Sequence, residues 1–379
     1  MTTTDVTLNY RLLGRSGLRV SDVALGTMLF GASTGWGVSG ETAKEQYDAY
    51  RAAGGNYLDT ANQYAGGESE MIIGGLVAGH RDEVVIASKY TNSAPTKSAT
   101  TNSAYARSGF GGGDANVGGN QRKNMMRSVE RSLRRLNTDY LDLYVVHSWD
   151  LLTPVEEVMR GLDDLVRAGK VLHIGVSNTP AWMVARANTI AELRGWTSYV
   201  GLQIEYSLLG RGAEAEYFPM AEELGLSVLA WSPLKNGLLT GKYAAGAGAG
   251  AGAAAGTGSR LTTEVWNSPA MAWTDPHGGN SKPVVEALVK LAAELEVTPA
   301  QLALAWLRHR PVHVVPILGA TSAAQLTENL RSVAIELTDD QVGRLDEVSS
   351  VPLGYPHNYL ASSMAKSFRS GGMYERISR

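Results

Sequence analysis

Four ionisable side chains lie close to the ends of short segments rich in aliphatic and β-branched residues. Asp59, Lys89 and His147 each close such a segment, and Tyr64 follows Asp59 by five positions. Each has an ordinary structural explanation alone, for example as a helix cap or a packed ring. If the segments are parallel strands, however, all four side chains meet at one edge of the sheet. Together they are able to protonate an oxygen atom on which negative charge develops.

The tyrosine requires its neighbours for this chemistry, because a free tyrosine has a pKa of about 10. An adjacent ammonium group stabilises the phenolate, and Asp59 would keep Lys89 charged. A shift of about three units corresponds to roughly 4 kcal/mol. His147 would orient a substrate carbonyl by donating a hydrogen bond. The set contains no reductant, so carbonyl reduction requires a hydride donor from outside the chain.

Later segments offer a binding surface for such a donor. Ser177, Asn178 and Gln203 carry groups that bond both ends of a carboxamide, as found on nicotinamide. Trp231 is placed to stack on a ring. The sequence "LGATSAAQLTEN" (318–329) has a glycine-containing turn that opens a helix, which favours phosphate binding.

A glycine motif elsewhere imitates a dinucleotide-binding fingerprint. Gly35, Gly37 and Gly40 have the Gly-x-Gly-x-x-Gly spacing, and Asp59 follows about twenty positions later. A true fingerprint places its first glycine directly after a strand, whereas "MLFGAST" intervenes here. We interpret the match as a chance one, and the stretch as a substrate loop that carries Trp36.

Eight segments have the composition of strands, and helical patterns lie between them. We expect strands at 21–27, 56–60, 83–89, 141–147, 171–177, 200–206, 226–232 and 312–318. The clearest helical patterns cover 41–54, 68–79, 121–136 and 154–169. Alternation of this kind favours a parallel sheet, and eight units in one run favour a closed (β/α)8 barrel of the TIM type.

We expect one α/β domain over residues 1–379, with the barrel at about 21–335. Residues 11–20 are expected to form a β-hairpin ahead of the first barrel strand. Long loops are expected at the C-terminal face at 91–120 and 235–281. The first would cover an active site, whereas the second would be either such a cover or a flexible linker. The second contains a Gly/Ala tract at 244–256, and residues 350–379 form a C-terminal tail.

The composition of the chain limits which kinds of partner it is expected to bind. The 379 residues are 44% hydrophobic and 19% charged, as in ordinary globular enzymes. The net charge of −3 and the lack of a basic block disfavour nucleic acid. Neither a membrane span nor a signal peptide is expected. The absence of cysteine fits a cytoplasmic location and excludes thiolate metal sites. Association of identical copies is left open.

Seven blocks in sequence order resemble the aldo-keto reductase family. They are "LDTANQYAGGESEMIIG", "ASKY", "YLDLYVVHSWD", "IGVSN", "LQIEYSLL", "AWSPLKNGLLTGKY" and "ILGATSAAQLTENL", within residues 10–347. "GGNQRKN" and "HSWD" are most similar to the aryl-alcohol dehydrogenase and potassium-channel β-subunit branches. The Gly/Ala tract and the tail "SFRSGGMYERISR" depart from the family pattern.

The resemblance implies a (β/α)8 barrel that reversibly reduces aldehydes and ketones with NADPH. It implies that Tyr64 is the general acid, that Asp59 and Lys89 tune it, and that His147 orients the carbonyl. The NADP(H) contacts we expect come from Thr27, Asp59, Ser177, Asn178, Gln203, Trp231, Ser232, Pro233, Leu234, Asn236, Gly237, Lys242, Arg260, Gly319, Thr321, Gln325, Glu328 and Asn329. The substrate, a small carbonyl compound or alcohol, would contact Trp36, Tyr64, His147 and Trp149.

Three other functions are weighed against this one. A cofactor-binding redox sensor like the channel β-subunits is disfavoured because His147 is present, where those subunits depart from the family. A Schiff-base aldolase would use Lys89 in its neutral form, which Asp59 opposes. A metal hydrolase would use His309 and His313, but Pro311 breaks any helix that aligns them, so no metal site is expected.

Overall fold

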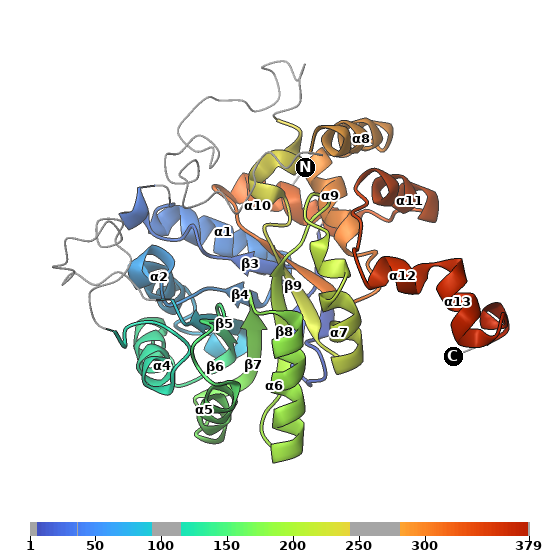
Figure 1. Cartoon of the computed structure of the whole chain (residues 1–379). Coiled ribbons are helices and arrows are strands. Elements are labelled where there is room, and N and C mark those ends of the chain that lie inside the picture. The colour runs from blue at the N-terminus through green and yellow to red at the C-terminus, as the bar shows by residue number, and fades with distance from the viewer. Residues whose placement is uncertain (1–5, 36, 93–114, 243–280, 378–379) are drawn as a thin grey trace.

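Eight parallel strands form a closed barrel in a computed structural model that describes residues 6–35, 37–92, 115–242 and 281–377. The strands are β3 (Ala24–Gly26), β4 (Tyr57–Asp59), β5 (Val85–Tyr90), β6 (Leu141–Val146), β7 (Val171–Ser177), β8 (Tyr199–Glu205), β9 (Ser227–Trp231) and β10 (Val314–Leu318). They neighbour one another in chain order, and β10 closes the barrel between β9 and β3 (Figure 1). The expected (β/α)8 fold is confirmed.

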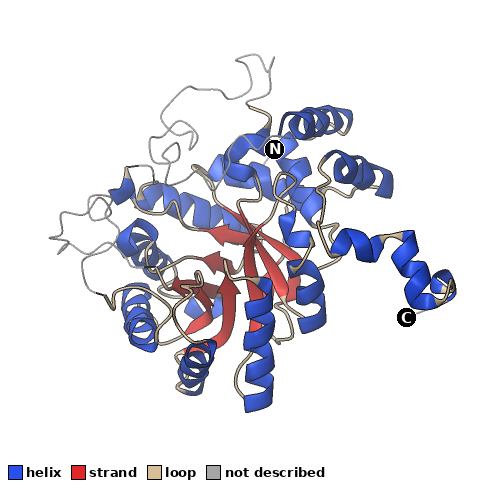
Figure 2. Ribbon diagram, viewed as in Figure 1, coloured by secondary structure: helices blue, strands red, loops and turns tan. Residues whose placement is uncertain are grey.

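Helices surround the strands on the outside of the barrel (Figure 2). They are α1 (Gly40–Ala52), α2 (Glu68–Leu76), α4 (Arg122–Leu136), α5 (Val155–Arg167), α6 (Ala181–Arg194), α7 (Tyr217–Leu224), α8 (Ser281–Glu294), α9 (Pro299–Leu307), α10 (Ala323–Leu330) and α11 (Asp339–Val348). Local signals define their ends: Thr298 and Thr338 form capping boxes, and glycines in the left-handed conformation end α6 and α7. None of the helices in the described ranges is long and apolar enough to cross a membrane.

Strand residues alternate between two apolar cores, since successive side chains of a strand point to opposite faces. Ala24, Tyr57 and Leu143 point into the barrel, whereas Leu25, Leu58 and Tyr144 pack against the helices. Nearly every residue of the central strands is buried on both faces, which explains their continuous apolar composition.

An antiparallel hairpin covers the N-terminal end of the barrel. Its strands are β1 (Tyr10–Leu12) and β2 (Arg19–Ser21), as expected for a hairpin ahead of the barrel. Leu13 and Val20 are fully buried in the interior core. The Gly14 amide donates to Ser227 Oγ at 2.8 Å, which fixes the hairpin to β9. The hairpin thus closes the barrel opposite the end where the strands deliver Asp59, Lys89 and His147.

The structure corrects several boundaries. The first barrel strand begins at Ala24 rather than at residue 21, because Ser21 pairs with Tyr10 in the hairpin. The segment predicted as a loop from residue 235 begins with a 3-10 helix, Lys235–Thr240, and α8 already starts at Ser281. The C-terminal tail contains α12 (His357–Ala361), α13 (Ser363–Ser370) and a 3-10 turn, Tyr374–Arg376. Residues 93–114 and the Gly/Ala tract lie outside the described residues.

Candidate functional site

Lys89 is the centre of the predicted catalytic group. Its Nζ donates to Asp59 Oδ1 at 2.6 Å, to the Thr60 carbonyl at 2.8 Å and to Tyr64 Oη at 3.2 Å. Asp59 ends β4, Lys89 lies near the end of β5, and Tyr64 begins a 3-10 turn, Tyr64–Gly67, after β4. These two strands are neighbours in the barrel, which is why residues distant in sequence meet. Three of the four predicted residues therefore form one hydrogen-bonded chain.

The electrostatics of this chain keep Lys89 charged. The side chain is fully buried, and burial alone would lower its pKa. The Asp59 carboxylate and the Tyr64 hydroxyl outweigh that penalty, so the pKa of Lys89 is raised. The ammonium also lies 4.9 Å from the centre of the Tyr64 ring. A cation in this buried position attracts a phenolate at Tyr64 more strongly than the same pair would attract in bulk water.

His147 faces the same tyrosine. The two rings are 5.9 Å apart and nearly perpendicular, with an interplanar angle of 79°. Burial, and then the nearby charge of Lys89, lower the pKa of His147 to about 3. The ring is therefore neutral near pH 7 and carries one N–H. Its Nδ1 is buried and has no hydrogen-bond partner in the described chain. The structure thus brings all four predicted catalytic residues together.

A buried ion pair supports the Tyr64 turn from behind, and sequence reasoning missed it. Arg135 on α4 donates to Glu70 on α2 at 2.6 Å, and Ser88 donates to the other oxygen of Glu70 at 2.5 Å. Arg135 also bonds the Asn62 carbonyl at 3.3 Å, and its guanidinium packs so closely on Gly67 that a Cβ there would lie 2.7 Å away. Both ends of the turn that carries Tyr64 thus rest on one arginine. Glu70 lies within the block "GGESEMIIG". A charged residue on a helix normally faces solvent, so nothing in the sequence indicated that Glu70 is buried.

Asn120 and Asp150 hold two loops of the C-terminal face together. The side chain of Asn120 accepts from the Asp150 amide at 2.7 Å and donates to the Ser148 carbonyl at 2.9 Å. Asp150 in turn accepts from the Asn120 amide at 2.7 Å. Burial would raise the pKa of Asp150, but amide and hydroxyl donors outweigh it and lower that pKa. The blocks "GGNQRKN" and "HSWD" are therefore parts of one structural unit beside His147, a role that their spacing did not reveal.

The residues expected around a nicotinamide lie next to the catalytic group. Ser177 pairs with Gln203 across β7 and β8. Gln203 donates through Nε2 to Asp59 Oδ2 at 2.8 Å, so Asp59 is bonded by Lys89 on one oxygen and by Gln203 on the other. Ser177 Oγ is buried and finds no hydrogen-bond partner in the described chain. The backbone of Asn178 is left-handed, and its side-chain Nδ2 donates to the His147 carbonyl at 2.9 Å.

Three further predicted site residues, Thr27, Trp231 and Trp149, differ in their burial and contacts. Thr27 is fully buried, and its hydroxyl donates to the Asp59 carbonyl at 3.0 Å, so it supports the strand end that carries Asp59. Trp231 ends β9 and is half-buried. Trp149 is half-buried, and its amide donates to the Asn178 carbonyl at 3.3 Å, which joins the predicted substrate and cofactor segments.

The segment after β9 is strained in a way that functional loops often are. Ser232, Lys235 and Asn236 have φ values of 51°, 46° and 53°, and Gly237 has 95°. Asn236 Oδ1 is buried without a hydrogen-bond partner in the described part of the chain. Pro233 and Leu234 form the turn between Ser232 and this 3-10 helix. A Cβ on Gly237 would lie 3.3 Å from Lys242 Nζ. The ammonium of Lys242, one of the expected cofactor contacts, therefore lies over this glycine.

The turn after β10 opens α10 as expected. Ser322 caps the helix, and the Thr321 amide donates to Gln325 Oε1 at 2.8 Å. Gly319 and Glu328 are exposed, whereas Asn329 is buried. Two predicted residues, Trp36 and Arg260, lie outside the described residues.

The glycine motif does not have the geometry of a dinucleotide fingerprint. β3 ends at Gly26, and a 3-10 turn, Ala32–Thr34, precedes Gly35. A parallel bridge between Phe30 and Val38 closes the segment into a compact loop. Asp59 is meanwhile engaged by Lys89 and Gln203. The loop lies near Tyr64 instead, since Ser33 donates to the Ala65 carbonyl at 3.2 Å.

The two histidines weighed as metal ligands are also separated. His309 follows the end of α9, and His313 Nδ1 lies 3.0 Å from Ser227 Oγ at the other end of the barrel from Lys89. Among the residues that the structure describes, no three His, Cys, Asp or Glu side chains are grouped so that they could hold a metal ion.

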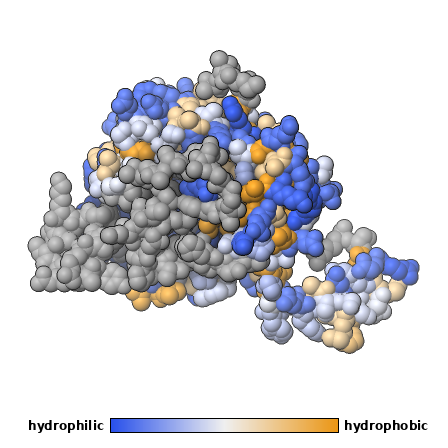
Figure 3. Space-filling view, turned by 90° about the horizontal axis from the view of Figure 1, so that it is seen from above, coloured by the Kyte–Doolittle hydropathy of each residue, from blue (hydrophilic) through white to orange (hydrophobic). Residues whose placement is uncertain are grey.

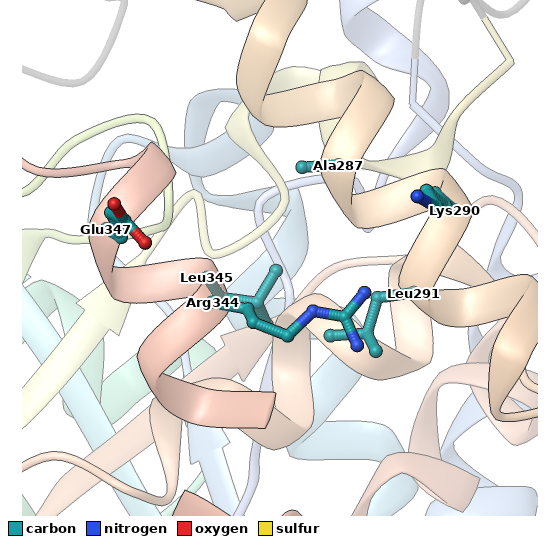
Figure 4. Close-up of a pocket in the computed structure, with 6 residues that line it drawn as sticks. All are labelled: Ala287, Lys290, Leu291, Arg344, Leu345 and Glu347. Atoms are coloured by element: carbon teal, nitrogen blue, oxygen red, sulfur yellow. The ribbon is translucent and has the colours of Figure 1, made fainter. Parts of the chain in front are cut away.

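A hollow of about 220 Å³ lies between α8 and α11 on the outside of the barrel (Figure 4). Its lining residues are Ala287, Lys290, Leu291, Arg344, Leu345 and Glu347, and none belongs to the candidate site. Arg344 lies at its centre in the view and forms an ion pair with Glu294 at 2.8 Å. This hollow separates two outer helices and has no connection to the catalytic chemistry.

Comparison with known proteins agrees with this geometry. The chain is 34% identical to a norsolorinic acid reductase of Emericella nidulans, over 94% of this chain and 85% of the relative. It is also 34% identical to a putative aryl-alcohol dehydrogenase of Saccharomyces cerevisiae, over 94% and 90% of the two chains. The family model for the Aldo/keto reductase family matches residues 22–350, which include the whole barrel and all four catalytic candidates. The chain therefore belongs to the aldo/keto reductase family, and it is an oxidoreductase.

Proposed function

We propose that this enzyme reduces an aldehyde or ketone to an alcohol with NADPH, reversibly, and that Tyr64 is the general acid. The observation that carries the proposal is the position of Lys89, whose ammonium touches both Asp59 and Tyr64 in a buried setting. A bound nicotinamide would supply the hydride. Tyr64 Oη would donate its proton to the carbonyl oxygen as charge develops there, and Lys89 would stabilise the phenolate that remains.

His147 and Asp59 act around this transfer. As a neutral ring, His147 donates one hydrogen bond to the carbonyl oxygen and orients it without competing as an acid. Asp59 holds the ammonium of Lys89 in place through the 2.6 Å contact. A Schiff-base nucleophile must be a neutral amine, whereas the charged state of Lys89 is favoured here. This disfavours the aldolase mechanism.

The residues present fit a nicotinamide dinucleotide. Ser177 Oγ and Asn236 Oδ1 are buried polar atoms without partners in the described chain, and an unsatisfied polar group of this kind costs about 1–3 kcal/mol. Ser177, Asn178 and Gln203 would hold the carboxamide, and Trp231 would stack on its ring. Ser232, Pro233, Leu234, Asn236, Gly237 and Lys242 would follow the pyrophosphate. Gly319, Thr321, Gln325, Glu328 and Asn329 would meet the adenosine end.

A preference for NADPH over NADH rests on donors near the start of α10. Thr321, Ser322 and Gln325 would face a 2′-phosphate, and Lys242 and Arg260 would add positive charge. No arginine lies within residues 318–329, so a bidentate clamp is missing there. We therefore expect a modest discrimination of about 1–3 kcal/mol. We also propose a cytoplasmic location, with which the cysteine-free sequence is compatible.

For the substrate we propose an aromatic carbonyl compound or aryl alcohol. Relatives named norsolorinic acid reductase and aryl-alcohol dehydrogenase support this class. Trp149 lies two positions after His147 and is half-buried, and it would offer an aromatic surface to such a substrate. Trp36 would be a second such surface.

The test is a panel of aromatic aldehydes, α-dicarbonyls and keto sugars, assayed by oxidation of NADPH or NADH, with wild type and Tyr64→Phe. The substitution removes one hydroxyl, and general acid catalysis is worth roughly 10²–10⁴-fold, so kcat should fall by that factor. Quenching of tryptophan fluorescence by NADPH should persist in the variant. A variant that keeps more than half of the activity would remove Tyr64 from the mechanism. Borohydride trapping of substrate on Lys89 would favour the aldolase, and cofactor binding without turnover would favour the redox sensor.

A further inference from the structure

The last segment of the chain leaves the barrel and has no counterpart in the family match. That match ends at residue 350, and residues 350–377, called the arm here, contain α12 and α13. Figure 1 shows the arm, in red, extending away from the barrel. Between described residues, one side-chain hydrogen bond joins it to the barrel, from His357 Nε2 to Glu216 Oε1 at 2.8 Å. The arm is otherwise held by bonds within itself, such as that from Arg369 to the Leu360 carbonyl at 2.6 Å.

The arm exposes large apolar side chains. Tyr355 is 88% exposed, Phe368 73% and Met364 55%. Met364 and Phe368 are four residues apart on α13, so they lie on one face of the helix. In the space-filling view the arm stands out from the barrel as a separate lobe on which apolar and hydrophilic residues mix (Figure 3). Several large exposed apolar side chains grouped on one short segment are typical of an interaction site.

The net charge of the arm indicates what kind of surface binds it. Residues 350–377 contain Lys366, Arg369 and Arg376 against the single acid Glu375, a net charge of +2. Since the whole chain carries −3 and Arg379 adds +1, residues 1–349 carry −6. The arm is therefore basic and apolar, and the barrel of the same chain is acidic. Opposite charges of this kind steer and align two protein surfaces.

The root of the arm directs it away from its own barrel. Arg211 donates to Ser349 Oγ and to the Asp346 carbonyl, both at 2.9 Å, where α11 ends. The bond between His357 and Glu216 fixes α12 in the same way. From there α13 runs outward, away from the barrel of its own chain (Figure 1).

We propose that the arm docks on the barrel of a second copy of this chain, and that the two copies exchange arms about a two-fold axis. Such an interface is closed, because each copy gives and receives the same arm. At about 200 Å² for each aromatic side chain, the exposed fractions of Tyr355, Tyr359, Phe368 and Tyr374 leave roughly 500 Å² of ring surface per arm. Two arms and the surfaces that they cover reach the roughly 1,200–2,000 Å² of a stable interface.

The experiment is sedimentation velocity of the full chain at micromolar concentration, for wild type, Phe368→Asp and Ser367→Asp. The two variants add the same charge on neighbouring residues of α13, but only the first removes an exposed ring. We expect a dimer of 40.4 kDa protomers for wild type and Ser367→Asp, and at least a tenfold weaker dimer for Phe368→Asp. Far-ultraviolet circular dichroism and turnover per protomer should be the same in all three.

Two results would overturn the proposal. One is a wild-type monomer at micromolar concentration, and the other is a dimer that Phe368→Asp leaves intact. A flotation assay with vesicles of phosphatidylcholine and phosphatidylserine identifies the other occupant. A wild-type monomer that binds these vesicles, with binding lost in Phe368→Asp, would assign the arm to a lipid surface instead of a second copy.

Discussion

His147 shows how its surroundings, rather than its residue type, decide what a side chain contributes. A free histidine titrates near pH 6.5, but burial and the charge of Lys89 lower the pKa of His147 to about 3. The ring therefore stays neutral between pH 5 and 8. We expect kcat/KM for carbonyl reduction to show no inflection from this group between pH 5 and 8. The measurement is a pH profile of kcat/KM for wild type and His147→Gln.

The glutamine variant is the control, because it keeps a hydrogen-bond donor but cannot titrate. It should lower kcat/KM at every pH while leaving the shape of the profile unchanged. An inflection near pH 6.5 that disappears in His147→Gln would show that the histidine changes its charge during catalysis, and the neutral assignment would then be wrong.

The elements behind the Tyr64 turn make a second prediction. Arg135 on α4 is the ion-pair partner of Glu70 on α2, whose side chain is fully buried. Arg135→Met removes the cation and leaves a buried carboxylate uncompensated, which costs about 3–5 kcal/mol. The free energy of unfolding, measured in urea, should fall by that amount. Activity should fall as well, since the same arginine supports Asn62 and Gly67 on either side of Tyr64.

Arg186→Met is the matched control for this prediction. Arg186 pairs with Glu156 between α5 and α6, but both side chains are about half exposed. Exposed pairs contribute about 0–1 kcal/mol, so this variant should unfold almost as wild type does. Equal effects of the two substitutions would mean that the pair at Glu70 has no special role.

The loop between β3 and α1 makes a third prediction, which concerns the glycine motif. A Cβ on Gly37 would lie 1.9 Å from the Gly31 carbonyl oxygen, whereas a Cβ on Gly40 would meet nothing within 4 Å. Gly37→Ala should therefore distort the loop and raise KM for the carbonyl substrate. Gly40→Ala should leave the NADPH dissociation constant within about twofold, well below the tenfold that 1.4 kcal/mol represents.

Fluorescence titration with NADPH and initial rates with the best carbonyl substrate measure these two effects. A true pyrophosphate loop would respond differently, because its last glycine is needed for close packing of the helix on the strand. A large rise in the NADPH dissociation constant for Gly40→Ala, with an unchanged fold, would therefore restore the fingerprint that we reject.

At the level of the whole molecule, the stability of the fold includes contacts at the closed N-terminal end of the barrel. His313 there joins the start of β10 to β9. Its Nδ1 lies 3.0 Å from Ser227 Oγ, which also accepts the Gly14 amide of the hairpin. Burial, and then the charge of Arg11, lower the pKa of His313 to about 4. In the unfolded chain this histidine therefore becomes protonated below about pH 6.5, whereas in the folded chain it stays neutral down to about pH 4. Stability is full above pH 6.5 and falls as the pH drops through this window.

The expected contribution of one proton is a slope of about 1.4 kcal/mol per pH unit in the free energy of unfolding. His313→Gln should reduce the slope by about that amount between pH 6.5 and 4.5. Urea unfolding at several pH values measures it. Above pH 7 the slopes of the variant and wild type should coincide, and a difference confined to that range would contradict the prediction.

The sequence alone determined the repeating order of strands and helices, because the patterns of β-branched runs, amphipathic stretches and terminal glycines are local. It also placed Asp59, Lys89 and His147 at strand ends, and a parallel barrel brings such ends to one face. Contacts between distant segments were decided only by the tertiary structure. They include the bond of Gln203 to Asp59, the support of the Tyr64 turn by Arg135 and the junction of Asn120 with Asp150. Burial and partners, which no spacing encodes, also set the neutral state of His147 and the charged state of Lys89.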